Sequence, residues 1–269
     1  MTETTHDPTT IRDAARRLLD AASSGVPSTP VRDLIGATDI AAAYAVQQEV
    51  NRVRLADGAR VIGRKIGLTS KAVQAQLGVD QPDLGVLFAD MEYAAAVPVP
   101  LDRLLQPRVE AEVAFVLGAD LDENDLDLEQ VTHAVHHAVA AIEICDSRIA
   151  DWDITFADTV ADNASAGGFV LGTEKLALER FVPREATMTM RVTGQDDSTG
   201  TGADCLGDPL LALQWLARTA RGLGEPLRAG QVVLSGAIGP MRPAAPGARV
   251  DVAISGLGLL SITFAEAGR

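Results

Sequence analysis

Two glutamates on one predicted strand are the residues best suited to chemistry in this sequence. Apolar residues alternate with Glu110 and Glu112 along residues 108–116, and strand side chains repeat with a period of two. Both carboxylates therefore point to one face, with their Cα atoms roughly 6.5–7 Å apart. Two carboxylates at this separation can reach one cation, and they repel each other if nothing lies between them.

A third carboxylate lies in another apolar run. Glu143 stands between two isoleucines in residues 139–144, which predict a second strand. Three carboxylates on apolar strands suit a hard divalent cation such as Mg²⁺ or Mn²⁺, which prefers oxygen ligands. The alternative is that Glu110 and Glu112 lie on the solvated outer face of a half-exposed strand.

The composition of the chain excludes several classes of binding partner. The chain has 269 residues, enough for one large domain or two small ones, and a formal net charge of −14. Nucleic acids and anionic membranes require basic patches, so neither is an expected partner, whereas a small anionic substrate needs only local cations or a metal. Two cysteines give no disulfide framework. Since no apolar run of membrane-spanning length and no signal-peptide pattern is present, we expect a cytoplasmic protein.

The elements that position these residues begin with two helices. Helical spacing of apolar residues predicts helices over 11–23 and 40–56, separated by a break rich in glycine and proline at 25–30. Together they predict a small helical N-terminal lobe over residues 1–60. The remainder, residues 61–269, is predicted to be a β-rich catalytic domain.

A lysine in the next predicted strand is the main cationic candidate. Within residues 60–70, Gly63 and Gly67 bracket Arg64 and Lys65. Because desolvating an ammonium group is costly, Lys65 must be paired or functional unless its side chain extends to the surface. The spacing matches neither the phosphate loop nor the dinucleotide-binding fingerprint.

The segment between Lys65 and the predicted strand of Glu110 and Glu112 combines a predicted helix with a predicted loop. Residues 71–77 predict a short helix, and the glycine and proline content of residues 78–91 predicts a loop. Asp83 lies just before an apolar part of this loop. It is either a turn-forming residue or an acid presented over a site.

Four segments resemble the 2-keto-4-pentenoate hydratases, also called 2-hydroxypenta-2,4-dienoate hydratases, of bacterial aromatic meta-cleavage pathways. This family belongs to the fumarylacetoacetate hydrolase superfamily, together with the 4-oxalocrotonate decarboxylases. The likeness extends from about residue 14 to residue 264, and the motifs are specific as a set. The segments are 63–69 (GRKIGLT), 78–83 (GVDQPD), 106–112 (QPRVEAE) and 158–165 (DTVADNAS).

The resemblance implies three metal-binding carboxylates and three catalytic residues, namely a lysine, an acid and a substrate-contacting serine. The metal ligands would be Glu110, Glu112 and Glu143. The catalytic residues would be Lys65, Asp83 and Ser165. The glutamates and the lysine are the same residues that the local patterns single out.

For several other polar residues the sequence gives less evidence of a functional role. Cys145 departs from the family pattern, and we expect it to pack rather than to act as a nucleophile, since no local charge pattern would lower its thiol pKa. Arg148 either pairs with a carboxylate of the metal site or is a surface charge. Three histidines in a predicted helix lack the glutamates that would complete a metal site, and we expect them on a solvated face: His133, His136 and His137.

The C-terminal third resembles a sheet-rich barrel. Helices are predicted over 128–139 and 208–221, and a polar turn over 194–202. Strands are predicted over 167–172, 186–192, 232–235, 249–254 and 257–264. Strands beside a few helices, without regular βαβ alternation, indicate the α+β class. The resemblance implies a distorted β-roll or barrel of the fumarylacetoacetate hydrolase C-terminal type.

The resemblance also implies a reaction. A 2-hydroxy-2,4-dienoate would chelate the metal through its carboxylate and 2-oxygen, which stabilises the enolate-like charge of tautomerisation. Water would then add at C4 to give a 4-hydroxy-2-oxo acid. Lys65 would hold or protonate the oxygen end, Asp83 or a neighbouring acid would shuttle protons, and Ser165 would hydrogen-bond the substrate.

Two alternatives accompany this hypothesis. One is a 4-oxalocrotonate-type decarboxylase, which would use the same scaffold and the same metal. The other is a non-catalytic subunit that stabilises another enzyme of the pathway. The resemblance further implies a homo-oligomer, a pentamer or a decamer, and association with another pathway enzyme.

Overall fold

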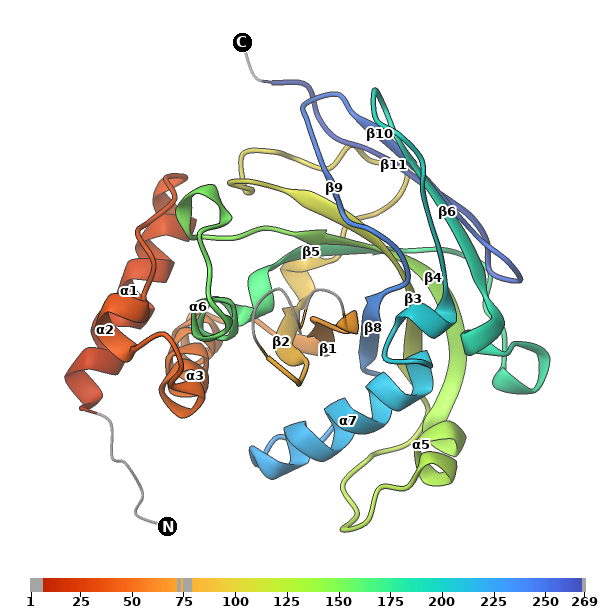
Figure 1. Ribbon diagram of the computed structural model, residues 1–269, viewed down its shortest axis with the longest axis horizontal. Helices are drawn as coiled ribbons and strands as arrows, with labels where there is room; N and C mark the ends of the chain where they lie inside the picture. The colour runs from red at the N-terminus through yellow and green to blue at the C-terminus, as the bar shows by residue number, and fades with distance from the viewer. Residues whose placement is uncertain (1–6, 72–73, 75–78, 268–269) are drawn as a thin grey trace.

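The protein consists of two β-sheets with helices along their outer sides (Figure 1). The computed structural model describes residues 7–71, 74 and 79–267. Apart from residues 71 and 74, the helix predicted over 71–77 lies outside the described residues. No helix in the described part of the chain combines the length and apolar character needed to cross a membrane.

The larger sheet is mixed and has the strand order β2-β1-β8-β3-β4-β5, with the short strand β9 paired to β3. Strands β1 and β8 run parallel, while the other neighbours are antiparallel. Strand β8 thus lies between two strands that are much earlier in the chain. The members are β1 (Val61–Gly67), β2 (Asp83–Phe88), β3 (Arg108–Leu117), β4 (Val135–Cys145), β5 (Ala166–Leu171), β8 (Val232–Ala237) and β9 (Arg242–Pro243).

The smaller sheet is antiparallel, with the order β11-β10-β6-β7. It packs with helix α7 against one face of the larger sheet to form the main core. The elements are β6 (Thr187–Val192), β7 (Ser198–Thr201), β10 (Arg249–Ile254), β11 (Gly258–Thr263), α5 (Leu128–Ala134) and α7 (Pro209–Gly222).

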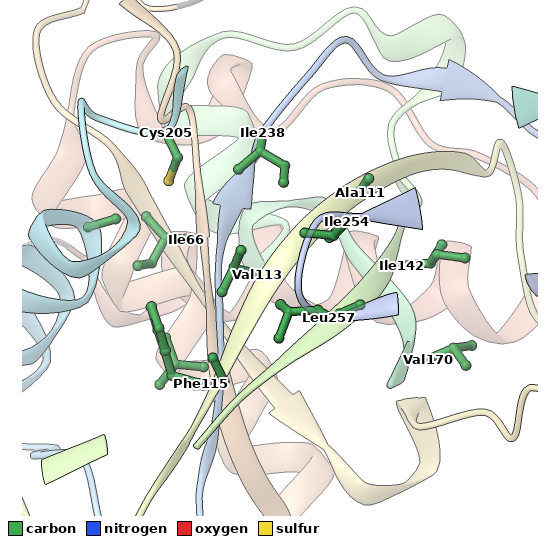
Figure 2. Close-up of a cluster of buried hydrophobic side chains, with 14 of the residues drawn as sticks. Ile66, Ala111, Val113, Phe115, Ile142, Val170, Cys205, Ile238, Ile254 and Leu257 are labelled. Carbon is green, nitrogen blue, oxygen red and sulfur yellow. The ribbon is translucent and has the colours of Figure 1, made fainter. Parts of the chain in front are cut away.

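The alternation along β3 divides its residues between two environments. Ala111, Val113 and Phe115 point into the main core, beside Ile142 of β4 (Figure 2). On the opposite face of β3, Ala114 belongs to a separate apolar cluster that fills one end of the curled sheet. The other end of that face carries the glutamates.

The helices on the left of Figure 1 form a third cluster. Helix α1 (Pro8–Ser24) is followed by the short α2 (Arg32–Ile35) and by α3 (Ile40–Ala56), which confirms both N-terminal helix predictions. Helix α6 (Phe156–Ala161) packs on them although it comes much later in the chain. The predicted division after residue 60 stays a prediction.

Three sequence predictions of local structure were wrong. Strand β2 occupies part of the predicted loop 78–91, because its apolar residues pair with β1 despite Gly85. The helix predicted over 128–139 ends at Ala134, since pairing with β3 begins at Val135. The polar segment 194–202 contains strand β7, which pairs with β6. In each case pairing with a distant strand overrides the local sequence signal.

Candidate active site

Three glutamates lie together on the face of the sheet opposite the main core. Glu110 on β3 pairs directly with Glu143 on β4, and Glu112 follows two residues along β3. Glu112 and Glu143 are fully buried, which excludes the solvated-face alternative for this face. One ligand atom each from Glu110, Glu143 and Cys145 lie within 4.8 Å of one another, a spacing that fits one cation.

The hydrogen bonding of these carboxylates is incomplete. Glu112 Oε2 accepts a hydrogen bond from Gly236 N at 2.7 Å, but Glu112 Oε1 and both carboxylate oxygens of Glu143 have no hydrogen-bond partner. Buried, unsatisfied carboxylate oxygens are costly, and a divalent cation would satisfy them with the oxygen ligands that Mg²⁺ and Mn²⁺ prefer. The residues present therefore fit a divalent metal.

Burial and mutual repulsion shape the protonation of the cluster. Burial, followed by the charge of Glu143, raises the pKa of Glu110 to about 7. Burial and the same neighbour raise the pKa of Glu112 well above its usual range. Without a cation the site therefore retains protons that free carboxyl groups would lose at neutral pH.

Lys65 of β1 faces the glutamates across the curled sheet. Its Nζ lies 3.1 Å from Glu143 Oε1, in an ion pair whose angle is not that of a hydrogen bond, and it donates a hydrogen bond to Ala164 O at 3.0 Å. The side chain is buried and paired with Glu143, which confirms the prediction that Lys65 is paired or functional and excludes the surface alternative. Burial alone would lower the pKa of Lys65, but Glu143 and the other nearby acids raise it well above its ordinary value.

Asp83 and Ser165 are joined through a third residue. Thr159 on α6 donates a hydrogen bond to Asp83 Oδ2 at 3.2 Å, and its Oγ1 lies 3.5 Å from Ser165 Oγ. Asp83 Oδ1 has no hydrogen-bond partner. Burial raises the pKa of Asp83, and the charge of Lys65 opposes this. Thr159 was not among the predicted site residues, although it lies within the 158–165 motif.

The backbone before β5 presents Ser165 in an unusual conformation. Asn163, Ala164 and Ser165 form the short turn η3 and have φ values of 56°, 51° and 52°, in the left-handed region. The Asn163 side chain holds this turn by bonding Val86 N at 2.7 Å and Val86 O at 2.9 Å. The strained turn aims the Ala164 carbonyl at Lys65.

Arg148 supports the same turn. Its Nε lies 2.5 Å from Asp162 Oδ1, and its guanidinium also donates to the carbonyl oxygens of Asp146, Asp162 and Ala166. Both sequence alternatives for Arg148, a metal-site partner or a surface charge, were therefore wrong. Asp162 is the buried partner that the sequence did not reveal.

Cys145 lies beside the carboxylates, with its Sγ 3.6 Å from Glu110 Oε2. Burial, followed by the charge of Glu110, raises its pKa well above the ordinary thiol value. A thiol in this environment is a poor nucleophile, as expected from the sequence.

The three histidines lie away from this site, around the junction of α5 and β4. His133 and His136 are exposed as expected, whereas His137 is buried. The ring nitrogens Nδ1 of His136 and His137 lie 2.9 Å apart. Among the described residues, no histidine belongs to a group of three potential metal ligands.

A cavity of about 840 Å³ gives access to the site. Four of the six predicted site residues line it: Lys65, Asp83, Glu110 and Ser165. Apolar side chains, including Leu68, Ile154 and Met241, form much of the rest of its wall. The cavity can therefore hold a small organic acid with its polar end near the glutamates.

This fold belongs to a known family. Residues 60–265 match the family described as fumarylacetoacetate (FAA) hydrolase C-terminal. The chain is a member of the fumarylacetoacetate hydrolase family, and the predicted α+β class and family fold are confirmed.

Three known proteins are similar along nearly the whole chain. The TodF product hydratase of Pseudomonas putida is 53% identical over 96% of both chains. The 2-keto-4-pentenoate hydratase of Burkholderia vietnamiensis is 50% identical over 97% of this chain and 99% of its own. The solved 4-oxalocrotonate decarboxylase from Pseudomonas putida G7, complexed with magnesium and adipate, has a TM-score of 0.92 and 31% identity over 97% of this chain and 99% of its own.

Proposed function

We propose that the protein is a metal-dependent hydro-lyase of aromatic meta-cleavage degradation. It adds water to 2-hydroxypenta-2,4-dienoate, or to a substituted analogue, and yields a 4-hydroxy-2-oxo acid. The names of its close relatives support this reaction. The observation that carries the proposal is the cluster of buried carboxylates with unsatisfied oxygens, placed beside Lys65 at a cavity.

In this proposal, three carboxylates would hold one divalent metal, Mg²⁺ or Mn²⁺, whose positive charge would polarise the 2-oxo acid end of the substrate. The ligands are Glu110, Glu112 and Glu143. Lys65 carries a proton beside the oxygen end of the substrate and balances the negative charge of Glu143. Its bond to Ala164 O fixes the ammonium group in place.

The second half of the site moves protons and orients the substrate. Burial raises the pKa of Asp83, which favours its protonated form and so its use as a proton donor as well as an acceptor. Thr159 holds the Asp83 carboxyl group, and Ser165 hydrogen-bonds the substrate beside it. Asp83 thereby exchanges protons with the substrate carbon and with the attacking water.

The test follows the loss of dienoate absorbance with and without Mg²⁺ or Mn²⁺. We expect Glu110→Gln and Lys65→Ala each to lower kcat by about 100-fold or more, because the first removes a carboxylate ligand and the second the buried cation. Glu129→Gln, an exposed change on α5, serves as the matched control and should leave the rate unchanged. Unchanged rates in both site variants would refute the assignment.

The second candidate function is decarboxylation of 4-oxalocrotonate, favoured by the overall similarity to the decarboxylase. The same metal and lysine would stabilise the same dienolate. Supplying 4-oxalocrotonate and measuring CO₂ separates the two reactions. Release of CO₂ at a rate exceeding dienoate hydration would make the decarboxylase the better description.

We also propose a cytoplasmic homo-oligomer, a pentamer or a decamer, that associates with another enzyme of the pathway. The family resemblance supports this assembly. Light scattering of the purified protein gives the number of subunits directly. A monomer at micromolar concentration would contradict it.

A further inference from the structure

Arg108 occupies a position that the proposed reaction does not yet use. It begins β3 two residues before Glu110, and it pairs across the sheet with Cys145, whose thiol contacts Glu110. Its guanidinium carbon lies 4.4 Å from the centre of the Trp152 ring. Both Arg108 and Trp152 line the same cavity as Glu110 and Lys65.

Trp152 is held rigidly enough to orient this guanidinium. Asp151 and Trp152 have φ values of 58° and 56°, a strained left-handed conformation for residues other than glycine. Gln106 fixes them, because Gln106 O accepts a hydrogen bond from Trp152 Nε1 at 3.1 Å and Gln106 Oε1 accepts one from Asp151 N at 2.7 Å. Such strain persists only where the surroundings determine the conformation, and here its result is a fixed aromatic surface for Arg108.

Within the described residues Arg108 makes no ion pair and no side-chain hydrogen bond, and its guanidinium contacts the Trp152 ring instead. Lys65, the other cation of the cavity wall, is already engaged by Glu143 and Ala164. Other partly buried arginines, such as Arg32 and Arg148, pair with carboxylates. In a chain with a net charge of −14, a stacked arginine with free donors facing a cavity indicates an anionic ligand.

We propose that Arg108 binds the C1 carboxylate of the substrate and so determines the requirement for an acid. This inference rests on the proposed function. Arg108 lies on the Glu110 and Cys145 side of the carboxylate cluster, and Asp83 lies beside Lys65 across the sheet. A substrate whose carboxylate lies between the glutamate cluster and Arg108 then has its reacting carbons directed toward Lys65 and Asp83.

The planar guanidinium can donate two parallel hydrogen bonds to a carboxylate, and stacking on Trp152 leaves its edge available for them. A lysine at this position would keep the charge but lose both the stacking and the paired donors. An amide in place of the substrate carboxylate would leave Arg108 facing a neutral group. Arg108 therefore selects acids over their neutral derivatives.

The test uses the fluorescence of Trp152 to measure the binding of a substrate-like acid. The chain has two tryptophans, and Trp215 lies on α7, so Trp215→Phe leaves Trp152 as the only indole. In this background, 2-oxopentanoate is titrated in the presence of Mg²⁺ while Trp152 emission is recorded. We expect Arg108→Gln to weaken binding by about 10- to 100-fold, as the loss of a charged hydrogen-bond pair predicts, and Arg108→Lys to weaken it less.

Two controls separate this role from a structural one. Arg191→Gln removes the same charge from an exposed ion pair on β6 and should leave binding unchanged. Mn²⁺ affinity of Arg108→Gln should be equal to or tighter than that of the parent, since a nearby positive charge has been removed. A large loss of Mn²⁺ affinity would overturn the proposal in favour of a structural role.

Three further outcomes of the titration would each overturn the proposal for a different reason. Unchanged binding of 2-oxopentanoate by Arg108→Gln overturns the proposal and leaves the proposed hydratase intact. 2-Oxoadipate carries a second carboxylate at the end away from C1. If Arg108→Gln weakens the binding of 2-oxoadipate but not of 2-oxopentanoate, Arg108 binds the second carboxylate and the proposal is wrong. Failure of the parent to bind any 2-oxo acid with Mg²⁺ would overturn both the proposal and the function on which it rests.

Discussion

At the scale of single residues, the site consists of charged groups in buried positions, where desolvation of a charge is energetically unfavourable. Glu112, Glu143 and Lys65 are buried, and the ion pair between Lys65 and Glu143 compensates only part of their cost. The unsatisfied oxygens that remain are the strongest reason to expect a bound cation. Structural stability alone would be served better by apolar residues at these positions.

Metal affinity distinguishes two possible ligand sets. We predict that Glu110→Gln and Glu112→Gln each weaken Mn²⁺ binding by about 100-fold or more, while Cys145→Ala weakens it by less than about tenfold, because hard cations prefer oxygen. Titration of each variant with Mn²⁺, followed by electron paramagnetic resonance, measures this. Equal losses for Cys145→Ala and Glu110→Gln would favour the set Glu110, Glu143 and Cys145 and a softer metal.

Sequence reasoning found the residues whose chemical type is conspicuous in its surroundings. Glu110 and Glu112 interrupt a regular apolar alternation, and Lys65 lies inside an apolar strand, so each stands out without a structure. Thr159 and Asn163 act through contacts with Asp83 and Val86, which are distant in the chain. Ordinary polar residues of this kind carry no local signal.

At the scale of elements, the close approach of β1, β2 and η3 depends on glycine. A Cβ atom on Gly85 would lie 2.4 Å from Asn163 O, and one on Gly67 would lie 2.2 Å from Asp83 Oδ1. Real Cβ contacts are not this short, so larger residues would push the turn or Asp83 away. The two glycines let the backbone approach the site from both sides.

The turn η3 gives a prediction at this scale. Asn163→Ala removes both hydrogen bonds to Val86 and leaves buried backbone groups unpaired, which should lower the free energy of unfolding by about 2–4 kcal/mol and reduce kcat. Urea denaturation and steady-state kinetics measure the two effects. As a control, Ala164→Gly relieves the left-handed strain and should change stability by less than about 1 kcal/mol. If Asn163→Ala changed neither the free energy of unfolding nor kcat, the turn would keep its conformation without these two hydrogen bonds.

Elements with strong periodicity were predicted well and strands with mixed composition were not. The spacing of apolar residues and the Asp39 cap give helix α3 its observed bounds, Ile40–Ala56. Strand β2 contains Gly85 and follows a proline, so only its pairing with β1 identifies it. The start of β4 at Val135 likewise depends on β3 rather than on the helical pattern before it.

At the scale of the whole molecule, the raised carboxyl pKa values make stability depend on pH. In the metal-free protein the pKa of Glu110 is raised to about 7 by burial and by Glu143. Between about pH 4.5 and 7 the folded state therefore binds more protons than the unfolded state. The contribution of Glu110 to the free energy of unfolding therefore falls as the pH rises through this range.

We predict that metal-free wild-type protein loses up to about 3 kcal/mol of stability between pH 5 and 8 relative to Glu110→Gln, whose amide does not titrate. Urea unfolding at several pH values in the presence of a chelator measures the difference. Added Mg²⁺ should remove this loss, because the bound cation stabilises the ionised carboxylate. Parallel pH profiles for the two metal-free proteins would contradict the prediction.

The insertion of β8 between β1 and β3 has a consequence for biosynthesis. Residues 232–237 are made after both β1 and β3, yet they join the strand of Lys65 to the strand of Glu112 and supply Gly236 N to Glu112. Until they leave the ribosome, the nascent chain carries two exposed strand edges, which are prone to pair wrongly. The cavity site is thus incomplete until β8 has been made, and a chain released before residue 232 carries all six residues of the proposed site without the strand that joins them.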